Sequence, residues 1–207
     1  AIDRAGQVGT DGPTHAGSYD ITYLSTLPNF IIMAPSNQNE LVRMINTSLL
    51  IDDRPSAFRY PRGTGIFNEN DLDSRVLEIG KGYIVTQGND IAILNLGTRM
   101  ESCEEAIKLL KDHNIFPTLA DARFAKPIDK DLINQLLDNH KYVITIEEGS
   151  SGGFGATVLN YIHNERVKPT SAKISNIFFP DRFNDHQSPE DQYLEKGMDA
   201  GSIAQKI

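Results

Sequence analysis

The sequence has one cysteine, Cys103, among 207 residues, so no disulfide bond can form within the chain. Stable disulfides belong to oxidising compartments, and their exclusion favours a reducing one, so we expect a cytoplasmic protein. The single cysteine and the five histidines show no metal-ligand spacing, which leaves no zinc pattern. No apolar run approaches the ~18 residues of a membrane-spanning helix.

Basic residues are also scarce. The chain has 20 Lys+Arg against 28 Asp+Glu, a net charge of −8, and a pI near 5.1. A nucleic-acid-binding face has to neutralise phosphates, so this balance argues against such a function. Apolar residues make up 39% and charged residues 23% of the chain, as in ordinary globular proteins. This composition excludes a disordered chain, a collagen and a coiled coil.

Lysine is absent from residues 1–63, which carry five arginines and six acidic residues. The planar guanidinium of arginine suits bidentate recognition of phosphate or carboxylate. Chance in a short segment explains the bias equally well. Composition alone therefore leaves both interpretations open.

The order of apolar and polar segments predicts two units. Residues 1–63 are expected to form strand, Gly-rich loop, helix, strand, helix and strand, and residues 64–80 a polar linker. Residues 81–207 begin with an expected hairpin of 81–86 and 90–96. They continue with helices at 101–113, 131–139 and 156–165 and strands at 116–120, 142–146 and 174–179. This alternation predicts an α/β fold with a mostly parallel sheet covered on both faces.

The densest candidate for a site is the Gly-rich loop, with four glycines at positions 6, 9, 12 and 17. Asp11 and His15 could meet across a turn that contains Pro13, and such a pairing orients an imidazole for proton transfer. A turn-stabilising hydrogen bond is the more frequent role of two such residues in a loop. The spacing alone is therefore a modest signal.

A second Gly-rich segment, residues 149–155, lies between an expected strand and an expected helix. Such loops can bind anions with backbone N–H groups. This one lacks the Lys-Ser/Thr of a phosphate-binding loop and follows Glu147 and Glu148, which would repel phosphate. We therefore predict a tight strand-to-helix turn near a subunit contact. Cys103, on an apolar helix face, is predicted to be a small buried hydrophobe.

Several runs, in order along nearly the whole chain, resemble the 1-deoxy-D-xylulose-5-phosphate synthases, thiamine-diphosphate enzymes of the transketolase superfamily. These runs are residues 3–6 with 9–17, 32–36, 59–63, 92–98, 121–129, 147–155 and 197–200. The resemblance implies the end of a pyrimidine-binding (transketolase-like) domain at 1–63 and a transketolase C-terminal-like α/β/α domain at 81–207.

The resemblance also implies the activity and its partners. The full-length enzyme would be a homodimer that condenses pyruvate with glyceraldehyde 3-phosphate and releases CO₂, for isoprenoid, thiamine and pyridoxal biosynthesis. It would use thiamine diphosphate and Mg²⁺. The Gly-Asp-Gly…Asn motif, with which this family binds Mg²⁺ and the cofactor diphosphate, does not occur in this sequence. We therefore expect the cofactor ligands upstream of Ala1, and a chain that is inactive on its own and binds no cofactor.

By the same resemblance, four residues of this chain serve the substrate. Asp11 and His15 would lie at the substrate end of the active site, with His15 assisting proton transfer. Arg4 and Arg62 would face the phosphate of glyceraldehyde 3-phosphate. Arg59, three residues before Arg62 at a strand end, points elsewhere and is predicted to form a structural ion pair.

Two other interpretations remain. The chain could belong to another member of the superfamily, either a transketolase or the β-subunit of a 2-oxoacid dehydrogenase. It could also be a non-catalytic, flavodoxin-like assembly or ligand-binding module. The runs at residues 3–6, 11–15 and 59–63 favour the synthase.

Overall fold

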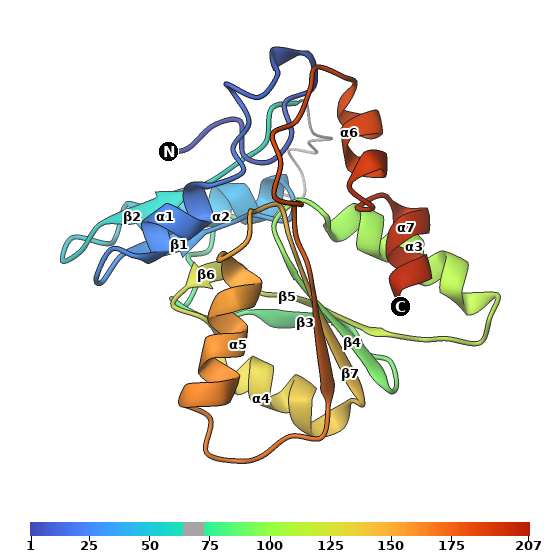
Figure 1. Ribbon diagram of the computed structural model, residues 1–207. Helices are drawn as coiled ribbons and strands as arrows, with labels where there is room; N and C mark the ends of the chain where they lie inside the picture. Colours follow the sequence, from blue (N-terminus) through green and yellow to red (C-terminus); the bar gives the residue numbers. More distant parts are fainter. Residues whose placement is uncertain (64–72) are drawn as a thin grey trace.

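Two β-sheets form the frame of the molecule. The computed structural model describes residues 1–63 and 73–207 (Figure 1). The small sheet has the strand order β2-β1-β6 and the large sheet the order β3-β5-β4-β7-β8. Their bounds are β1 (Ile31–Met33), β2 (Ser56–Phe58), β3 (Tyr83–Thr86), β4 (Ile91–Leu96), β5 (Thr118–Asp121), β6 (Phe124–Lys126), β7 (Tyr142–Glu147) and β8 (Lys173–Ile177).

Helices cover both faces of the large sheet (Figure 1). On one face, Ala92 and Leu94 of β4 join the core that α4 and α5 complete. On the other, Ile93 packs with residues of α3 and α7, as the alternation of strand side chains requires. The helices are α1 (Asp20–Ser25), α2 (Gln38–Ser48), α3 (Met100–Lys111), α4 (Lys130–Asn139), α5 (Phe154–Asn164), α6 (Pro189–Glu195) and α7 (Ala200–Lys206), with a 3₁₀ turn, η1 (Gly9–Asp11). In the described residues, no helix is long and apolar enough to span a membrane.

The large sheet confirms the expected α/β class. Strand β4 pairs in parallel with β5 and β7, and β7 with β8. Side chains cap the starts of α2 and α6. The side chain of Asn37 accepts the backbone N–H of Glu40 at the start of α2, and that of Ser188 accepts the N–H of Asp191 at the start of α6.

The expected hairpin of residues 81–96 is wrong. Strand β3 pairs antiparallel with β5, which lies between β3 and β4. The segment after β3 crosses the beginning of β5, and the chain then reverses into β4, so β3 and β4 run antiparallel without pairing. There Gly88 donates its N–H to the Thr118 hydroxyl at 2.9 Å. A Cβ on Gly88 would lie 2.0 Å from the carbonyl oxygen of Phe116, so this crossing requires glycine.

Strand β6 joins the two predicted units. It was not expected, and it pairs antiparallel with β1, with Ile32 opposite Lys126 and Met33 opposite Phe124. Residues 64–72 of the expected linker lie outside the described residues. In the remainder of that linker, Leu77 is buried and packs with Met33 and Phe124. The two units therefore share a core.

Candidate active site

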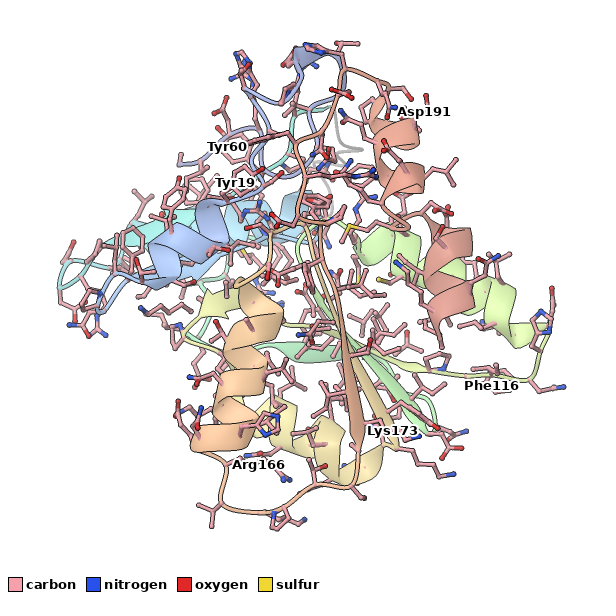
Figure 2. The ribbon with its side chains drawn as sticks, viewed as in Figure 1. Tyr19, Tyr60, Phe116, Arg166, Lys173 and Asp191 are labelled. Carbon is pink, nitrogen blue, oxygen red and sulfur yellow. The ribbon has the colours of Figure 1, made fainter. Side chains whose placement is uncertain are left out.

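The Gly-rich loop is closed at its base by a pair of glycines. Gly6 and Gly17 exchange backbone hydrogen bonds of 2.8 and 3.1 Å. A Cβ on Gly17 would lie 2.3 Å from the carbonyl oxygen of Arg4, so only glycine permits this approach. Before the loop, the backbone follows the end of β2, where the N–H of Ala5 donates to the carbonyl of Tyr60. The loop therefore starts from a fixed sheet edge, and Figure 2 labels Tyr60 beside it.

Three of the four predicted site residues come together beside this loop. Asp11 Oδ2 lies 3.6 Å from Nε of Arg4, and Asp11 Oδ1 lies 3.3 Å from Nη1 of Arg62. The same Nη1 donates to the backbone carbonyl of Val8 at 3.0 Å. About half of the Arg62 side chain (49%) is exposed. One carboxylate thus holds two arginines together at the surface, while exposed Asp3 pairs with Arg4 from outside.

His15 does not join this cluster. Its ring nitrogen Nδ1 lies 2.9 Å from the hydroxyl of Thr14, and its side chain is exposed. In the part of the chain that the structure describes, no hydrogen bond joins Asp11 to His15. The possible pairing of Asp11 and His15 across the turn is therefore not formed, and the Asp11 carboxylate faces two cationic guanidinium groups instead.

Arg59 forms the structural ion pair predicted for it. Its guanidinium binds Asp20 through two hydrogen bonds of 2.6 and 3.0 Å, and both residues are buried. The same side chain donates to the carbonyl oxygens of Gly17, at 2.8 Å, and Glu148, at 3.0 Å. Arg59 thus fixes the end of the Gly-rich loop to the segment after β7.

A buried cluster that was not predicted from the sequence lies behind the loop. Glu148 accepts a hydrogen bond of 2.6 Å from the hydroxyl of Tyr193 and lies 2.8 Å from Nε of Arg99. The Arg99 guanidinium stacks on the Tyr193 ring at 3.5 Å from its centroid. Burial, together with the nearby Glu148 carboxylate, raises the pKa of Tyr193, which therefore remains a hydrogen-bond donor. A sequence signal existed in the position of Glu148, an acid directly after a buried strand.

The segment at residues 149–155 is the tight turn that was predicted. The carboxylate of Glu147 accepts the backbone N–H groups of Phe154 and Gly155, both at 2.8 Å. Burial raises the pKa of Glu147, and the two N–H groups oppose that shift. The N-terminus of α5 therefore already binds an anion, the protein's own side chain.

Thiamine diphosphate, the cofactor that the resemblance implies, requires a site for its diphosphate and a set of metal ligands. The Gly-rich helix start at α5 would suit a diphosphate, but Glu147 fills it. Within residues 1–63 and 73–207, no group of three or more His, Cys, Asp or Glu side chains could hold a metal ion. The start of α5 therefore does not fit the diphosphate, and the described residues do not fit the metal.

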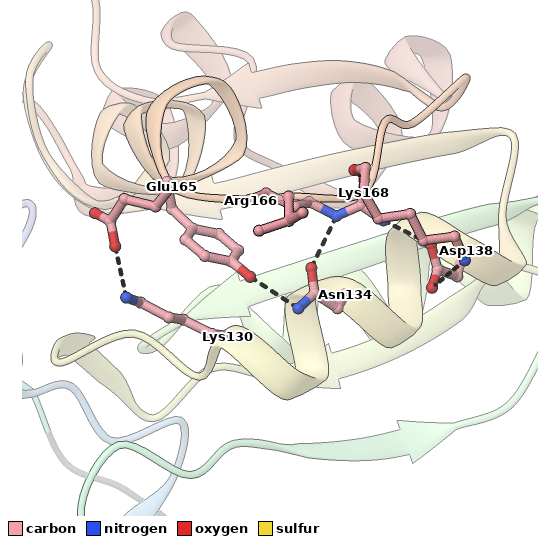
Figure 3. Close-up of a pocket in the computed structure, with 8 residues that line it drawn as sticks. Lys130, Asn134, Asp138, Glu165, Arg166 and Lys168 are labelled. Atoms are coloured by element: carbon pink, nitrogen blue, oxygen red, sulfur yellow. Dashed lines mark hydrogen bonds and ion pairs between the residues drawn. The ribbon is translucent and has the colours of Figure 1, made fainter.

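A pocket of about 400 Å³ lies between α4, α5 and the segment that follows α5 (Figure 3). Its polar groups bind one another. Lys130 pairs with Glu165 at 2.6 Å, and Arg166 binds Asn134 at 2.8 Å and Asp138 at 2.6 Å. Helices α4 and α5 lie at the end of the molecule opposite the Gly-rich loop (Figure 1). The pocket is therefore separate from the candidate site.

Family models match both halves of the chain. Residues 1–65 match the transketolase pyrimidine-binding domain, and residues 80–203 match the transketolase C-terminal domain. The chain belongs to the transketolase family.

Curated relatives of this transketolase-family chain include two plant proteins. It is 44% identical to a probable 1-deoxy-D-xylulose-5-phosphate synthase 2, chloroplastic, of Oryza sativa subsp. japonica. It is 46% identical to 1-deoxy-D-xylulose-5-phosphate synthase 1, chloroplastic, of Cannabis sativa. Both matches cover the whole chain, which spans 29% of the length of each relative.

Solved structures of transketolases share the fold. A split-gene transketolase, described as an inactive β4 tetramer, superposes with a TM-score of 0.82 at 24% identity, over 98% of this chain and 63% of that one. A transketolase from Campylobacter jejuni gives a TM-score of 0.70 at 17% identity, over 99% of this chain and 30% of that one. At these identities the likeness concerns the fold alone.

Proposed function

We propose that this chain is the C-terminal portion of a 1-deoxy-D-xylulose-5-phosphate synthase and carries the site for the phosphate of glyceraldehyde 3-phosphate. The cluster of Arg4, Asp11 and Arg62 is the observation that carries this proposal. The relatives at 44% and 46% identity support the reaction, in which pyruvate and the aldehyde condense with loss of CO₂.

Each residue has a distinct role in this proposal. Arg62 and Arg4 bind the phosphate, because guanidinium groups offer paired N–H donors that match its oxygens. Asp11 keeps the two arginines together before the substrate arrives, which reduces the ordering cost of binding. His15, an exposed residue of the loop, exchanges a proton with an oxygen atom that is bonded to one of the reacting carbons.

The remaining parts of the enzyme lie in the full-length protein. The family implies thiamine diphosphate with Mg²⁺, held by residues outside this chain, in an enzyme we propose to be a homodimer. The isolated chain is then inactive and binds no cofactor. Its one cysteine is buried and unpaired, which suits a reducing compartment such as the cytoplasm.

Product analysis of the full-length protein tests the proposal. With cofactor and Mg²⁺ present, pyruvate and glyceraldehyde 3-phosphate should give 1-deoxy-D-xylulose 5-phosphate and one CO₂ per turnover. Turnover of a ketose phosphate donor in place of pyruvate would indicate a transketolase instead. Acyl transfer from a 2-oxoacid to a lipoyl carrier would indicate a dehydrogenase β-subunit, and no turnover would favour a non-catalytic module.

A further inference from the structure

The glycines of the site loop mark where it meets the C-terminal half of the chain. Gly6, Gly9 and Gly12 all have positive φ, of 77°, 64° and 75°. A Cβ on Gly6 would lie 2.6 Å from the Glu148 carboxylate, and one on Gly12 would lie 2.3 Å from the His186 ring. On Gly9, a Cβ would lie 2.9 Å from Cδ of Pro189, the first residue of α6. The loop thus lies directly on α6 and the segment before it.

At the middle of this contact, one side chain of α6 binds both polar groups of a single loop residue. Gln192, buried with 1% of its surface exposed, accepts the N–H of Gly9 through Oε1 at 2.9 Å. Its Nε2 donates to the carbonyl of Gly9 at 3.3 Å and to that of Asp185 at 2.8 Å. The amide therefore uses both of its donor hydrogens and its acceptor on backbone groups.

The hydrogen bond to the Gly9 N–H leads directly to Arg62. That N–H and the carbonyl of Val8 belong to the same peptide group, and they point in opposite directions from a trans peptide. The carbonyl of Val8 accepts a hydrogen bond of 3.0 Å from Nη1 of Arg62. A continuous chain of hydrogen bonds thus runs from Gln192 through one peptide plane to the guanidinium group, and each bond polarises the next.

We propose that Gln192 is a positioning residue for Arg62. It fixes the Val8–Gly9 peptide plane, and through it the orientation in which Arg62 meets the substrate phosphate. This inference rests on the proposed function, because it needs a phosphorylated substrate at Arg62. It gives the C-terminal domain an indirect part in recognising that substrate, through a residue that does not touch it.

Kinetics of the full-length enzyme test this role. Gln192→Met keeps a similar side-chain volume and removes all three hydrogen bonds, so the KM for glyceraldehyde 3-phosphate should rise about 3- to 10-fold with kcat nearly unchanged. Unphosphorylated D-glyceraldehyde should be used as well by the variant as by the wild type. Gln192→Glu keeps an acceptor for the Gly9 N–H, and its KM should fall between the two.

Asp199→Ala provides a matched control. Asp199 caps α7 by accepting the N–H of Ser202, so its loss should lower the melting temperature of the same domain. It should leave the KM for glyceraldehyde 3-phosphate unchanged. A purely structural Gln192 would behave like this control.

A double-mutant cycle with Arg62→Ala separates the two roles further. Because Gln192 acts through Arg62, Gln192→Met should raise KM no further in the Arg62→Ala background. If the two substitutions raise KM by factors that multiply in the double variant, Gln192 does not act through Arg62. A Gln192→Met KM equal to that of the wild type would also overturn the positioning role. Neither result would contradict the proposed synthase function. If Gln192→Met does not fold, the same cycle with Gln192→Glu decides. A wild-type enzyme that forms no product from pyruvate and glyceraldehyde 3-phosphate would overturn the proposed function, and this role with it.

Discussion

Gly153 lies so close to Glu147 that a Cβ on the glycine would be 2.3 Å from Oε2 of the carboxylate. The same carboxylate binds the first N–H groups of α5. The glycines of this turn therefore make room for an internal anion, although the same pattern is typical of loops that bind phosphate from solution. Their spacing in the sequence does not distinguish the two uses.

This relationship predicts a non-additive pair of substitutions. Gly153→Ala in the full-length protein should lower the free energy of unfolding by about 1–3 kcal/mol, because the methyl group displaces a buried carboxylate from its donors. Glu147→Ala should cost a similar amount, since it leaves two buried N–H groups without an acceptor. In the Glu147→Ala background, Gly153→Ala should cost little, because the methyl group enters the vacated space. Urea unfolding of the four proteins measures this, and additive costs would contradict the geometry.

Asp121 predicts a pH-dependent stability. Burial raises the pKa of this carboxyl to about 6 from 3.8, against a hydrogen bond from the Ser36 hydroxyl at 2.6 Å. The native state then favours the protonated form, so ionisation destabilises the fold progressively from about pH 4 to pH 6. A shift of about two pKa units corresponds to about 3 kcal/mol.

Asp121→Asn should therefore gain stability relative to the wild type as the pH rises. The unfolding free energy of Asp121→Asn minus that of the wild type should have its lowest value at pH 4 and should rise to a plateau near pH 7. Urea titration of both proteins at each pH measures this difference. Exposed Asp131 is the matched control, because its hydrogen bond with Lys81 lowers its pKa and should give a weak trend of the opposite sign. A pH-independent difference for Asp121→Asn would show that this carboxyl titrates normally.

The sequence predicted those elements whose signals are local. The helices expected at 101–113, 131–139 and 156–165 are present as α3, α4 and α5, because helical spacing of apolar residues is a property of each segment by itself. The prediction of a hairpin at residues 81–96 was wrong because strand pairing there depends on a distant segment. The two strands are adjacent in sequence and separated by a turn-like segment, but β5, which begins 22 residues after the end of β4, inserts between them. A single sequence contains no direct record of such long-range pairing.

The same limit applies to the site. The Gly-rich loop drew attention to Asp11, and the resemblance to the synthases, not the arginine bias, implied Arg4 and Arg62; the structure brings these three residues together. Nothing local indicated Gln192, which lies 183 residues from the Gly9 backbone that it binds. A glutamine in an acidic helix looks like a solvated residue. Only the packing of α6 against the loop shows its contact.

Cys103 predicts a chemically silent thiol. It is fully buried, and burial raises its pKa to about 12, so the reactive thiolate is nearly absent at neutral pH. Iodoacetamide treatment of the native full-length protein at pH 7.5, followed by peptide mass mapping, should leave Cys103 unmodified. The same treatment in guanidinium should label it fully. Rapid native labelling would mean that the α3 side of the core opens readily.

Arg62 and His15 should fail in different ways when each is replaced in the full-length enzyme. In the proposed function, Arg62 contacts the substrate phosphate in both the ground state and the transition state, and Arg62→Ala removes that contact. The KM for glyceraldehyde 3-phosphate should therefore rise, by about 10- to 100-fold for a charged hydrogen bond of about 1.5–3 kcal/mol, with a smaller change in kcat.

His15→Ala should fail differently, because in the proposed function His15 transfers a proton near the reacting carbons. Its kcat should fall by roughly 10²- to 10⁴-fold, with less change in either KM. His15 is exposed and its ring bonds only to neighbouring Thr14 among the described residues, so the melting temperature should hardly change. Thr14→Ala is the matched control, because it removes the hydroxyl that contacts His15 and leaves the imidazole ring in place. This variant should retain most of kcat. A His15→Ala enzyme with near-normal kcat would remove His15 from the proposed mechanism, and an unchanged acceptor KM in Arg62→Ala would move the phosphate site away from this loop.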